Sequence, residues 1–369
     1  MDNLLSWMAL IAGIVVVAAT LNAAIKTVVL PRGEPVLITG VVFNLVRHFF
    51  LPFVKRARSY AARDRAMALY APIALLVMPA VWMLLVTSGY TAIFWAIGVR
   101  PVAEAFKVSG SSLLTLGFAE VFEPLAIVVA FSEATIGLGL MALLIAYLPS
   151  MYSAFSRRER MVSLLEVRAG APPSAVEMLS RAHRLRRLSS LKGEWERWEL
   201  WFAELEETHT SLAALVFFRS PQPGRSWVTA SGAVLDAAAL MASTVDVPRE
   251  PSAELCIRAG YLALRQIATF FEIEYDPDPE PNAPISISRS EYEAARELLA
   301  REGVALKSDC DQSWRDFAGW RINYDRVLLE LASLTMAPYA PWSSDRSHRQ
   351  ARRGEQRFRY GWRGIRFRA

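Results

Sequence analysis

Three long stretches of this sequence carry almost no charge, and they constrain the fold more than any other feature. The runs from Asn3 to Ile25 and from Ala66 to Val99 contain no charged residue. The run from Leu125 to Leu148 contains only Glu133. About 20 apolar residues in a helix cross the ~30 Å of bilayer hydrocarbon. Because unsatisfied backbone polar groups are costly in lipid, each run predicts a membrane-spanning helix.

The first run has a second interpretation, a secretory signal peptide. Such a peptide begins with positive charge and has a shorter apolar core. Here Asp2 precedes the run, and Lys26 and Arg32 follow it. A retained transmembrane helix within residues 1–30 is therefore preferred.

The second run is longer than one span needs. A span would use about Ala66 to Val86, and the remainder, Ser88 to Val99, contains Tyr90, Phe94 and Trp95. Aromatic residues favour the headgroup level of a bilayer. We therefore predict that this remainder lies at the outer interface.

The basic residues predict the orientation of the spans. Residues 31–66 hold seven lysines and arginines, whereas the loop between the second and third runs holds only Arg100 and Lys107. Three further arginines follow the third run within residues 157–160. Cytoplasmic loops are enriched in Lys and Arg. We expect a multi-pass protein of the cell membrane with its N-terminus outside and residues 151–369 in the cytoplasm.

Residues 31–66 are interpreted as a cytoplasmic basic linker. Their segment 36–54 is apolar but contains Gly40, Asn44, Arg47 and His48. We interpret it as an amphipathic helix on the inner leaflet. A fourth span stays open as the alternative, although it would place Arg47 and His48 in the bilayer and reverse every later segment.

Residues 151–344 carry most of the charge and predict a helical cytoplasmic domain, which makes the whole chain all-α. Prolines 172 and 173 precede a helix start, and Ser288 with Glu291 forms a capping box that opens a helix to about Arg301. One further helix is predicted from about Gln312 to Leu334. The repeat of Trp195, Trp198 and Trp201 on one helix face is typical of a packing seam.

The same region shows no residue pattern that is typical of an active site or a cofactor site. No nucleophile–base or paired-acid pattern stands out, so an enzyme is not expected. Cys256 and Cys310 are too few for a disulfide framework or a zinc site, and no cofactor is expected. Residues 345–369 hold nine arginines, and the segment Arg346 to Arg368 interleaves them with aromatic residues. This tail predicts binding to anionic lipid headgroups rather than to nucleic acid, with disorder as the alternative.

The functional prediction depends on the segment between the second and third runs. A short helix predicted over Pro101 to Ser111 is followed by a Ser-, Thr- and Gly-containing loop. Backbone that is not helical at membrane depth survives only where protein or a watery cavity satisfies its polar groups. Such a loop can use its own carbonyl oxygens as ligands for a cation. The residues concerned are Ser112, Thr115, Leu116, Gly117, Phe118, Ala119 and Glu120.

These residues resemble the filter of the potassium-channel pore family, particularly its bacterial members with two pore-forming spans. That filter reads Thr-Val-Gly-Tyr-Gly, with a Thr or Ser three positions upstream and an acid directly after it. The resemblance covers about residues 67–150. It implies a homotetramer in which four loops replace the water of a potassium ion, or another monovalent cation, by rings of carbonyl oxygens. Phe118 stands in place of the tyrosine, and Ala119 in place of the second glycine.

The third run contains candidate gating or cavity residues. Glu120, directly after the loop, is a further candidate. Gly137 and Gly139 lie where the family's inner helix has a hinge glycine, with close helix packing as the alternative. Glu133 either braces the filter, tunes ion concentration in a cavity, or extends to the outer interface. The alternative function, from a different class, is a membrane-anchored signalling or scaffold protein whose helical domain binds partners.

Overall fold

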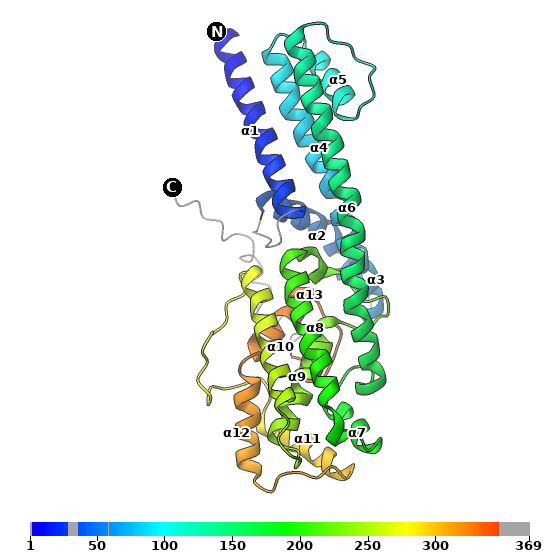
Figure 1. The fold of residues 1–369 in the computed structure, drawn as a ribbon, viewed down its shortest axis with the longest axis vertical. Coiled ribbons are helices and arrows are strands. Elements are labelled where there is room, and N and C mark those ends of the chain that lie inside the picture. The colour runs from blue at the N-terminus through cyan, green and yellow to red at the C-terminus, as the bar shows by residue number, and fades with distance from the viewer. Residues whose placement is uncertain (1, 29–35, 58, 347–369) are drawn as a thin grey trace. The chain divides into compact units, whose positions relative to one another are not determined.

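The computed structural model describes residues 2–28, 36–57 and 59–346, and they are predominantly helical (Figure 1). Within these ranges there is no β-strand, and the only ladder contact is a single bridge between Val245 and Leu306. The all-α prediction is confirmed. Four helical segments are long and apolar enough to cross a membrane, which is compatible with a membrane protein: Asn3–Val28, Leu37–Val54, Ala62–Ala96 and Pro124–Ala169.

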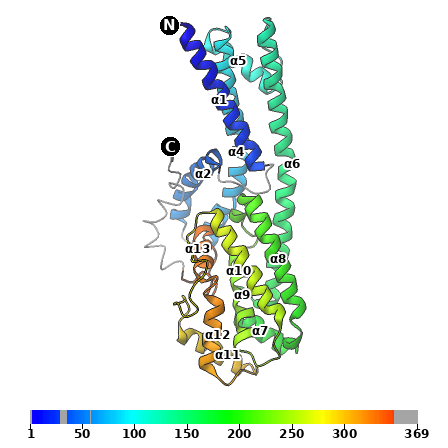
Figure 2. The same ribbon diagram turned by 60° about the vertical axis from the view of Figure 1, so that its left-hand side comes forward.

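The chain forms two compact units. The N-terminal unit contains Met1–Arg56 and Leu69–Ser153, and the C-terminal unit contains Ala57–Ala68 together with the described residues from Ala154 onward. The predicted linker 31–66 is thus divided at Arg56. Helix α6, Pro124–Ala169, is one continuous helix that contributes to both units (Figure 2).

The described part of the N-terminal unit contains five helices, or parts of helices. Helix α4 runs unbroken to Ala96, ten residues beyond the predicted end of the span at Val86. Tyr90 and Phe94 are buried within the unit, and the position of this stretch at the outer interface stays a prediction. The helices are α1 (Asp2–Val28), α2 (Leu37–Arg56), α4 (Tyr70–Ala96), α5 (Val102–Leu113) and the first part of α6.

Helices α1 and α4 approach each other closely at two glycines. A Cβ placed on Gly13 would lie 2.8 Å from Cγ1 of Ile93, and one placed on Gly89 would lie 2.7 Å from Cγ2 of Val17. Small residues at such a crossing let the backbones come together, which is how helices associate in lipid. This contact holds the first apolar run beside the second.

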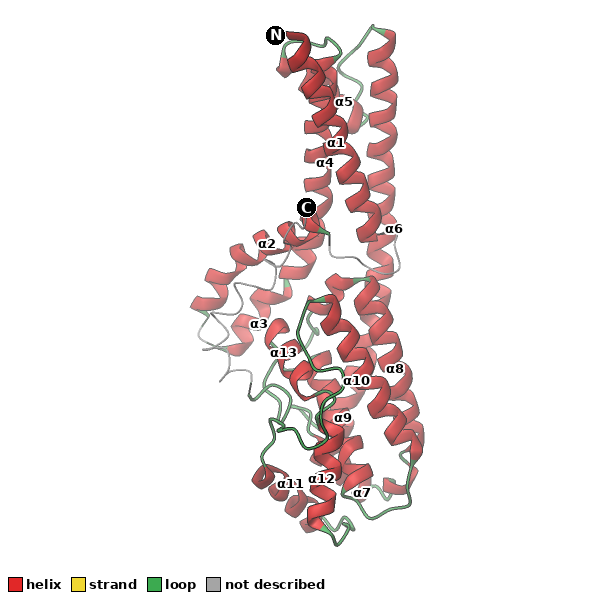
Figure 3. Ribbon diagram, turned by 90° about the vertical axis from the view of Figure 1, so that its left-hand side faces the viewer, coloured by secondary structure: helices red, strands yellow, loops and turns green. Residues whose placement is uncertain are grey.

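Helix α2 is inclined to α1 and α4 and packs near the start of α4 (Figure 3). The ring of Tyr70 lies between Phe43 and Phe50, with centroid distances of 6.0 and 6.3 Å. Leu45 and Phe49 are each 66% exposed on the other side of the helix. Both of its faces are therefore apolar, and its placement on the leaflet or across the membrane stays a prediction.

The glycine contact yields a first test. Replacing Gly13 by Leu should lower the free energy of unfolding by about 1–3 kcal/mol, because the added side chain overpacks the crossing. The matched control is Ala12→Leu on the exposed face of the same helix, which should leave stability nearly unchanged. Thermal unfolding of the purified protein in detergent measures both variants. Equal melting temperatures for the two variants would contradict the close crossing.

The C-terminal unit is built around α9, Trp227–Ser243, whose residues are almost all buried. Helices α7, α10, α12 and α13 pack against it. The predicted packing seam is confirmed, since Trp195, Trp198 and Trp201 are at most 3% exposed. The remaining helices are α3 (Tyr60–Ala68), α7 (Ala175–Arg184), α8 (Lys192–Ser211), α10 (Pro251–Phe270), α11 (Arg289–Arg301), α12 (Cys310–Arg321) and α13 (Asp325–Thr335), with 3₁₀ turns at Leu188–Ser190 and Ala213–Phe217.

Local signals located two helix starts correctly. The capping box between Ser288 and Glu291 is present and opens α11, and Ser174 caps α7 just after the two prolines. The single helix predicted over 312–334 is wrong. It is divided into α12 and α13 because Asn323 Nδ2 donates to the carbonyl of Gly319 at 2.9 Å and so terminates α12.

A buried arginine fixes the C-terminal part of α6 in this unit. Arg158 is 3% exposed and donates to the carbonyl oxygens of Leu215 and Phe218 at 2.8 and 2.7 Å. Its guanidinium also lies 3.1 Å from Nε2 of His209, whose Nδ1 lies 2.9 Å from the Leu205 carbonyl. In this arrangement Nδ1–H donates and Nε2 accepts, so His209 is neutral. Burial, and then the charge of Arg158, lower the pKa of His209 well below its ordinary value.

This histidine makes stability depend on pH. The unfolded chain takes up a proton at His209 below about pH 6.5, whereas the folded chain does not, so stability should fall as the pH drops through that value. The slope due to His209 is about 1.4 kcal/mol per pH unit at most. Thermal unfolding of the wild type and of His209→Gln between about pH 7 and pH 5 should show the smaller slope in the variant. Identical slopes would contradict a neutral buried His209.

Candidate functional site

Helix α5 and the residues after it lie between two long apolar helices. After α4 ends, α5 turns back beside it, and residues 114–123 return to the end at which α6 begins (Figure 3). The backbone of Leu113, the last residue of α5, lies against Gly137. Gly137 is 13 residues into α6, which corresponds to about 20 Å along the helix. The end of α5 is therefore beside the middle of the apolar part of α6, residues 125–148.

This position explains why residues 114–123 are not helical. Ten residues in a helix would cover about 15 Å, which is too short for a return of about 20 Å. An extended chain of that length reaches about 33 Å. The predicted short helix followed by a loop is therefore present as secondary structure.

Ser111 organises the start of this segment. Its carbonyl accepts from the amide of Leu116 at 2.8 Å, and its Oγ accepts from the amide of Ala119 at 3.2 Å. Thr115 and Gly117 adopt left-handed conformations, with φ of 54° and 71°. Ala119 is not among the described residues with positive φ, so its Cβ causes no strain of that kind.

The predicted filter residues lie at the surface of the single chain. Thr115, Leu116, Gly117, Phe118 and Glu120 are exposed. Ser112 and Ala119 are half-buried. Their apolar neighbours are open too, and Phe122 is 83% exposed. Contiguous apolar surface of this kind is typical of a membrane or protein contact.

Glu133 lies on the face of α6 that meets α5. Its side chain is fully buried, and Oε1 is 2.5 Å from Oγ of Ser109 on α5. Its Oε2 has no hydrogen-bond partner. The side chain is enclosed by the helices, and the three predicted roles of Glu133 stay predictions.

The two glycines of α6 differ in their surroundings. A Cβ on Gly137 would overlap the carbonyl of Leu113, whereas a Cβ on Gly139 would meet nothing within 4 Å. Gly137 therefore serves close packing, the alternative to a hinge. Gly139 lies on the exposed face of a helix that is continuous at this point.

Sequence reasoning gave no role to two serines that hold this region together. Ser109 contacts Glu133 and lies 3.1 Å from the carbonyl of Thr87, and Ser111 bonds the loop. Tyr90 adds a contact at 2.9 Å to Ser132 on α6. The spacing of Ser109 and Leu113 by one helical turn was visible in the sequence, but their partners were not.

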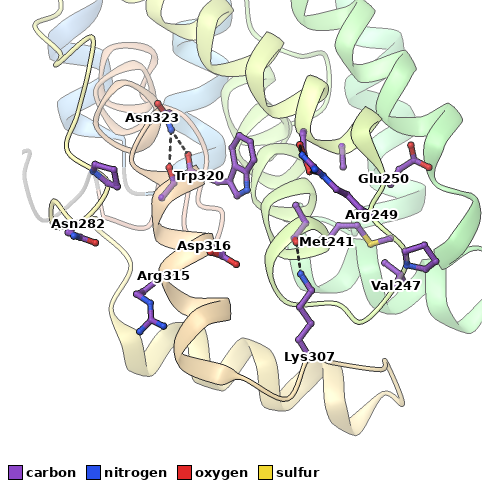
Figure 4. Close-up of a pocket in the computed structure, with 16 residues that line it drawn as sticks. Met241, Val247, Arg249, Glu250, Asn282, Lys307, Arg315, Asp316, Trp320 and Asn323 are labelled. Atoms are coloured by element: carbon purple, nitrogen blue, oxygen red, sulfur yellow. Dashed lines mark hydrogen bonds and ion pairs between the residues drawn. The ribbon is translucent and has the colours of Figure 1, made fainter.

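A cavity of about 750 Å³ in the C-terminal unit lies between α12 and the loop after α9 (Figure 4). Its charged groups already have partners in the chain. Arg249 is paired with Glu254 at 2.7 Å, and Lys307 donates to the carbonyl of Ala242 at 2.8 Å. Across the described ranges no three His, Cys, Asp or Glu side chains could hold a metal ion together.

Comparisons of the chain with protein-family models, with curated proteins and with solved structures give no match.

The contact of Gly137 predicts a difference between the two glycines. Gly137→Ala should lower the melting temperature in detergent, because the new methyl group displaces the end of α5. Gly139→Ala should leave it unchanged or raise it slightly, since Ala favours a helix over Gly and the site is open. A lower melting temperature for Gly139→Ala than for Gly137→Ala would contradict the packing described here.

Proposed function

We propose that this chain is one subunit of a homotetrameric, potassium-channel-like cation channel. The observation that carries the proposal is the position of α5 and residues 114–123. A short helix ends beside the middle of the apolar part of α6, and the chain returns without helical structure. About 20 Å from the start of α6 is near half the depth of a bilayer, once the headgroup region is included.

In the proposed channel the ion passes through the backbone carbonyls of residues 115–118. Rings of carbonyls from four subunits replace the hydration shell of a potassium ion or another monovalent cation. The C-terminal end of α5 carries a partial negative charge that favours a cation nearby. The left-handed conformations of Thr115 and Gly117 support the proposal, because left-handed residues that alternate with Leu116 and Phe118 can turn successive carbonyls toward the same side.

The exposed surface of the N-terminal unit supports assembly. Leu116 and Phe118 are 59% and 64% exposed in the single chain, next to the backbone that would bind the ion. Helix α6 adds an exposed apolar stripe at helical spacing, opposite its buried face at Glu133 and Gly137. The stripe contains Leu125, Val128, Phe131, Leu138, Ile145 and Tyr152.

The proposal places the C-terminal unit in the cytoplasm of the cell, as a gating or assembly domain. The basic tail would bind anionic lipid, but its residues 347–369 lie outside the described part of the chain. Arg346, the first arginine of that tail, is bonded to the Ser286 carbonyl at 2.9 Å and to Glu291. It belongs to the folded unit.

Ion flux tests the proposal directly. Purified protein in liposomes should conduct potassium in preference to sodium, and Gly117→Asp should abolish the flux by placing a side chain and a charge in the filter. Asp tolerates a left-handed conformation better than most residues, and Gly117 has open space around it, so this variant should fold. The control is Gly98→Asp, an exposed glycine that also has positive φ and open space but lies outside the segment.

The oligomeric state separates the two functions. Cross-linking or mass measurement in detergent should show four copies. A monomer without flux would contradict the channel and favour the membrane-anchored scaffold, in which residues 114–123 have no ion to bind. Flux that survives in Gly117→Asp would locate conduction elsewhere in the protein.

A further inference from the structure

We propose that Glu133 is a protonated, neutral acid that positions α5 through Ser109, and thereby sets the position of residues 114–123. The consequence for ion selectivity rests on the proposed channel function. The contact itself can be tested whether or not the protein conducts.

The number of protons in this contact determines the state of Glu133. Ser109 Oγ lies 2.5 Å from Oε1 of Glu133 and 3.1 Å from the carbonyl oxygen of Thr87. A hydroxyl has one proton to donate. If Glu133 were a carboxylate, one of these two contacts would bring together two oxygens with no hydrogen between them. If Glu133 is protonated, it donates to Ser109, and Ser109 donates to Thr87.

The surroundings of Glu133 also favour the neutral form. None of the ion pairs formed by the described residues includes Glu133, and its Oε2 is buried without a partner. The groups that interact with it are Ser109 from α5 and Tyr90 from α4. Tyr90 is the one titratable group among them, and its hydroxyl is bonded to Ser132. A buried charge without a cationic partner is strongly disfavoured.

The contact is placed where it can control the segment. Glu133 and Gly137 are one turn apart on α6, and they meet Ser109 and Leu113, which are one turn apart on α5. Ser111 lies between these two contacts and holds the amide of Ala119. A shift of α5 would therefore move Ser111 and the backbone that follows it. Glu133 is a positioning residue in this scheme, since it acts on the ion path through α5.

Four variants test the proposal. Glu133→Gln keeps the size of the side chain, stays neutral and can still donate to Ser109. Glu133→Leu and Ser109→Ala each remove one partner. The double variant, Ser109→Ala with Glu133→Leu, removes both and leaves no unpaired polar side chain, which is less harmful than removing one.

Two measurements are needed. The infrared spectrum of the wild type at neutral pH should contain the carbonyl band of a buried protonated carboxylic acid, and Glu133→Gln should lack it. In liposomes, Glu133→Gln should keep the potassium-to-sodium flux ratio of the wild type within about twofold. Glu133→Leu and Ser109→Ala should each lower it by up to about tenfold, the effect of one lost hydrogen bond. The double variant should lie closer to the wild type than either single variant.

The outcomes separate this proposal from the channel itself. If Glu133→Gln lowers the flux ratio as much as Glu133→Leu, or if the infrared band is absent from the wild type, Glu133 is charged and the proposal is overturned. If the wild type conducts no ion, the channel function fails. The infrared band and the melting temperature then test whether a protonated Glu133 bonds to Ser109. A band in the wild type, a melting temperature kept in Glu133→Gln and one lowered in Ser109→Ala would support the contact, and the opposite pattern would overturn it.

Discussion

The contact between the end of α5 and the apolar part of α6 determines where the non-helical backbone of the N-terminal unit lies. Gly137 has no side chain, so the carbonyl of Leu113 can rest against the α6 backbone. One turn earlier Glu133 meets Ser109. With α5 fixed at this depth, the ten residues before Pro124 are too few to return as a helix. They return along a non-helical path instead.

Polar side chains inside the C-terminal unit determine which segments belong to it. Arg219 donates to Asp64 on α3 at 2.8 Å and to the carbonyl of Thr335 at the end of α13 at 2.6 Å. This ion pair assigns α3 to the C-terminal unit, although α3 directly precedes α4 in the sequence. Arg321 is fully buried and donates to Asp236 and Asp325 at 2.6 and 2.7 Å. Removing one partner of such a buried group would leave an uncompensated charge.

Much of the helical architecture follows from local signals. Long uncharged runs predicted three of the four candidate spans, because length and hydropathy alone set whether a helix can cross lipid. The capping box at Ser288 predicted the start of α11 correctly for a similar reason, since its partners are three residues apart. The prediction failed at 312–334, where Asn323 ends a helix by bonding to its last turn. The sequence prediction also ended the third apolar helix near Leu148, whereas α6 continues to Ala169.

By itself the sequence determined that the chain is helical, that it carries apolar helices of membrane length, and which residues form the loop after the short helix. Those properties depend on composition and on residues close in the chain. Only the tertiary structure decided that Glu133 faces Ser109, that Gly137 packs and Gly139 does not, and that Arg158 and His209 lie together in the core. These partners are 24 to 51 residues apart. A helical pattern shows which side chains share a face, but the packing of one helix on another selects what that face meets.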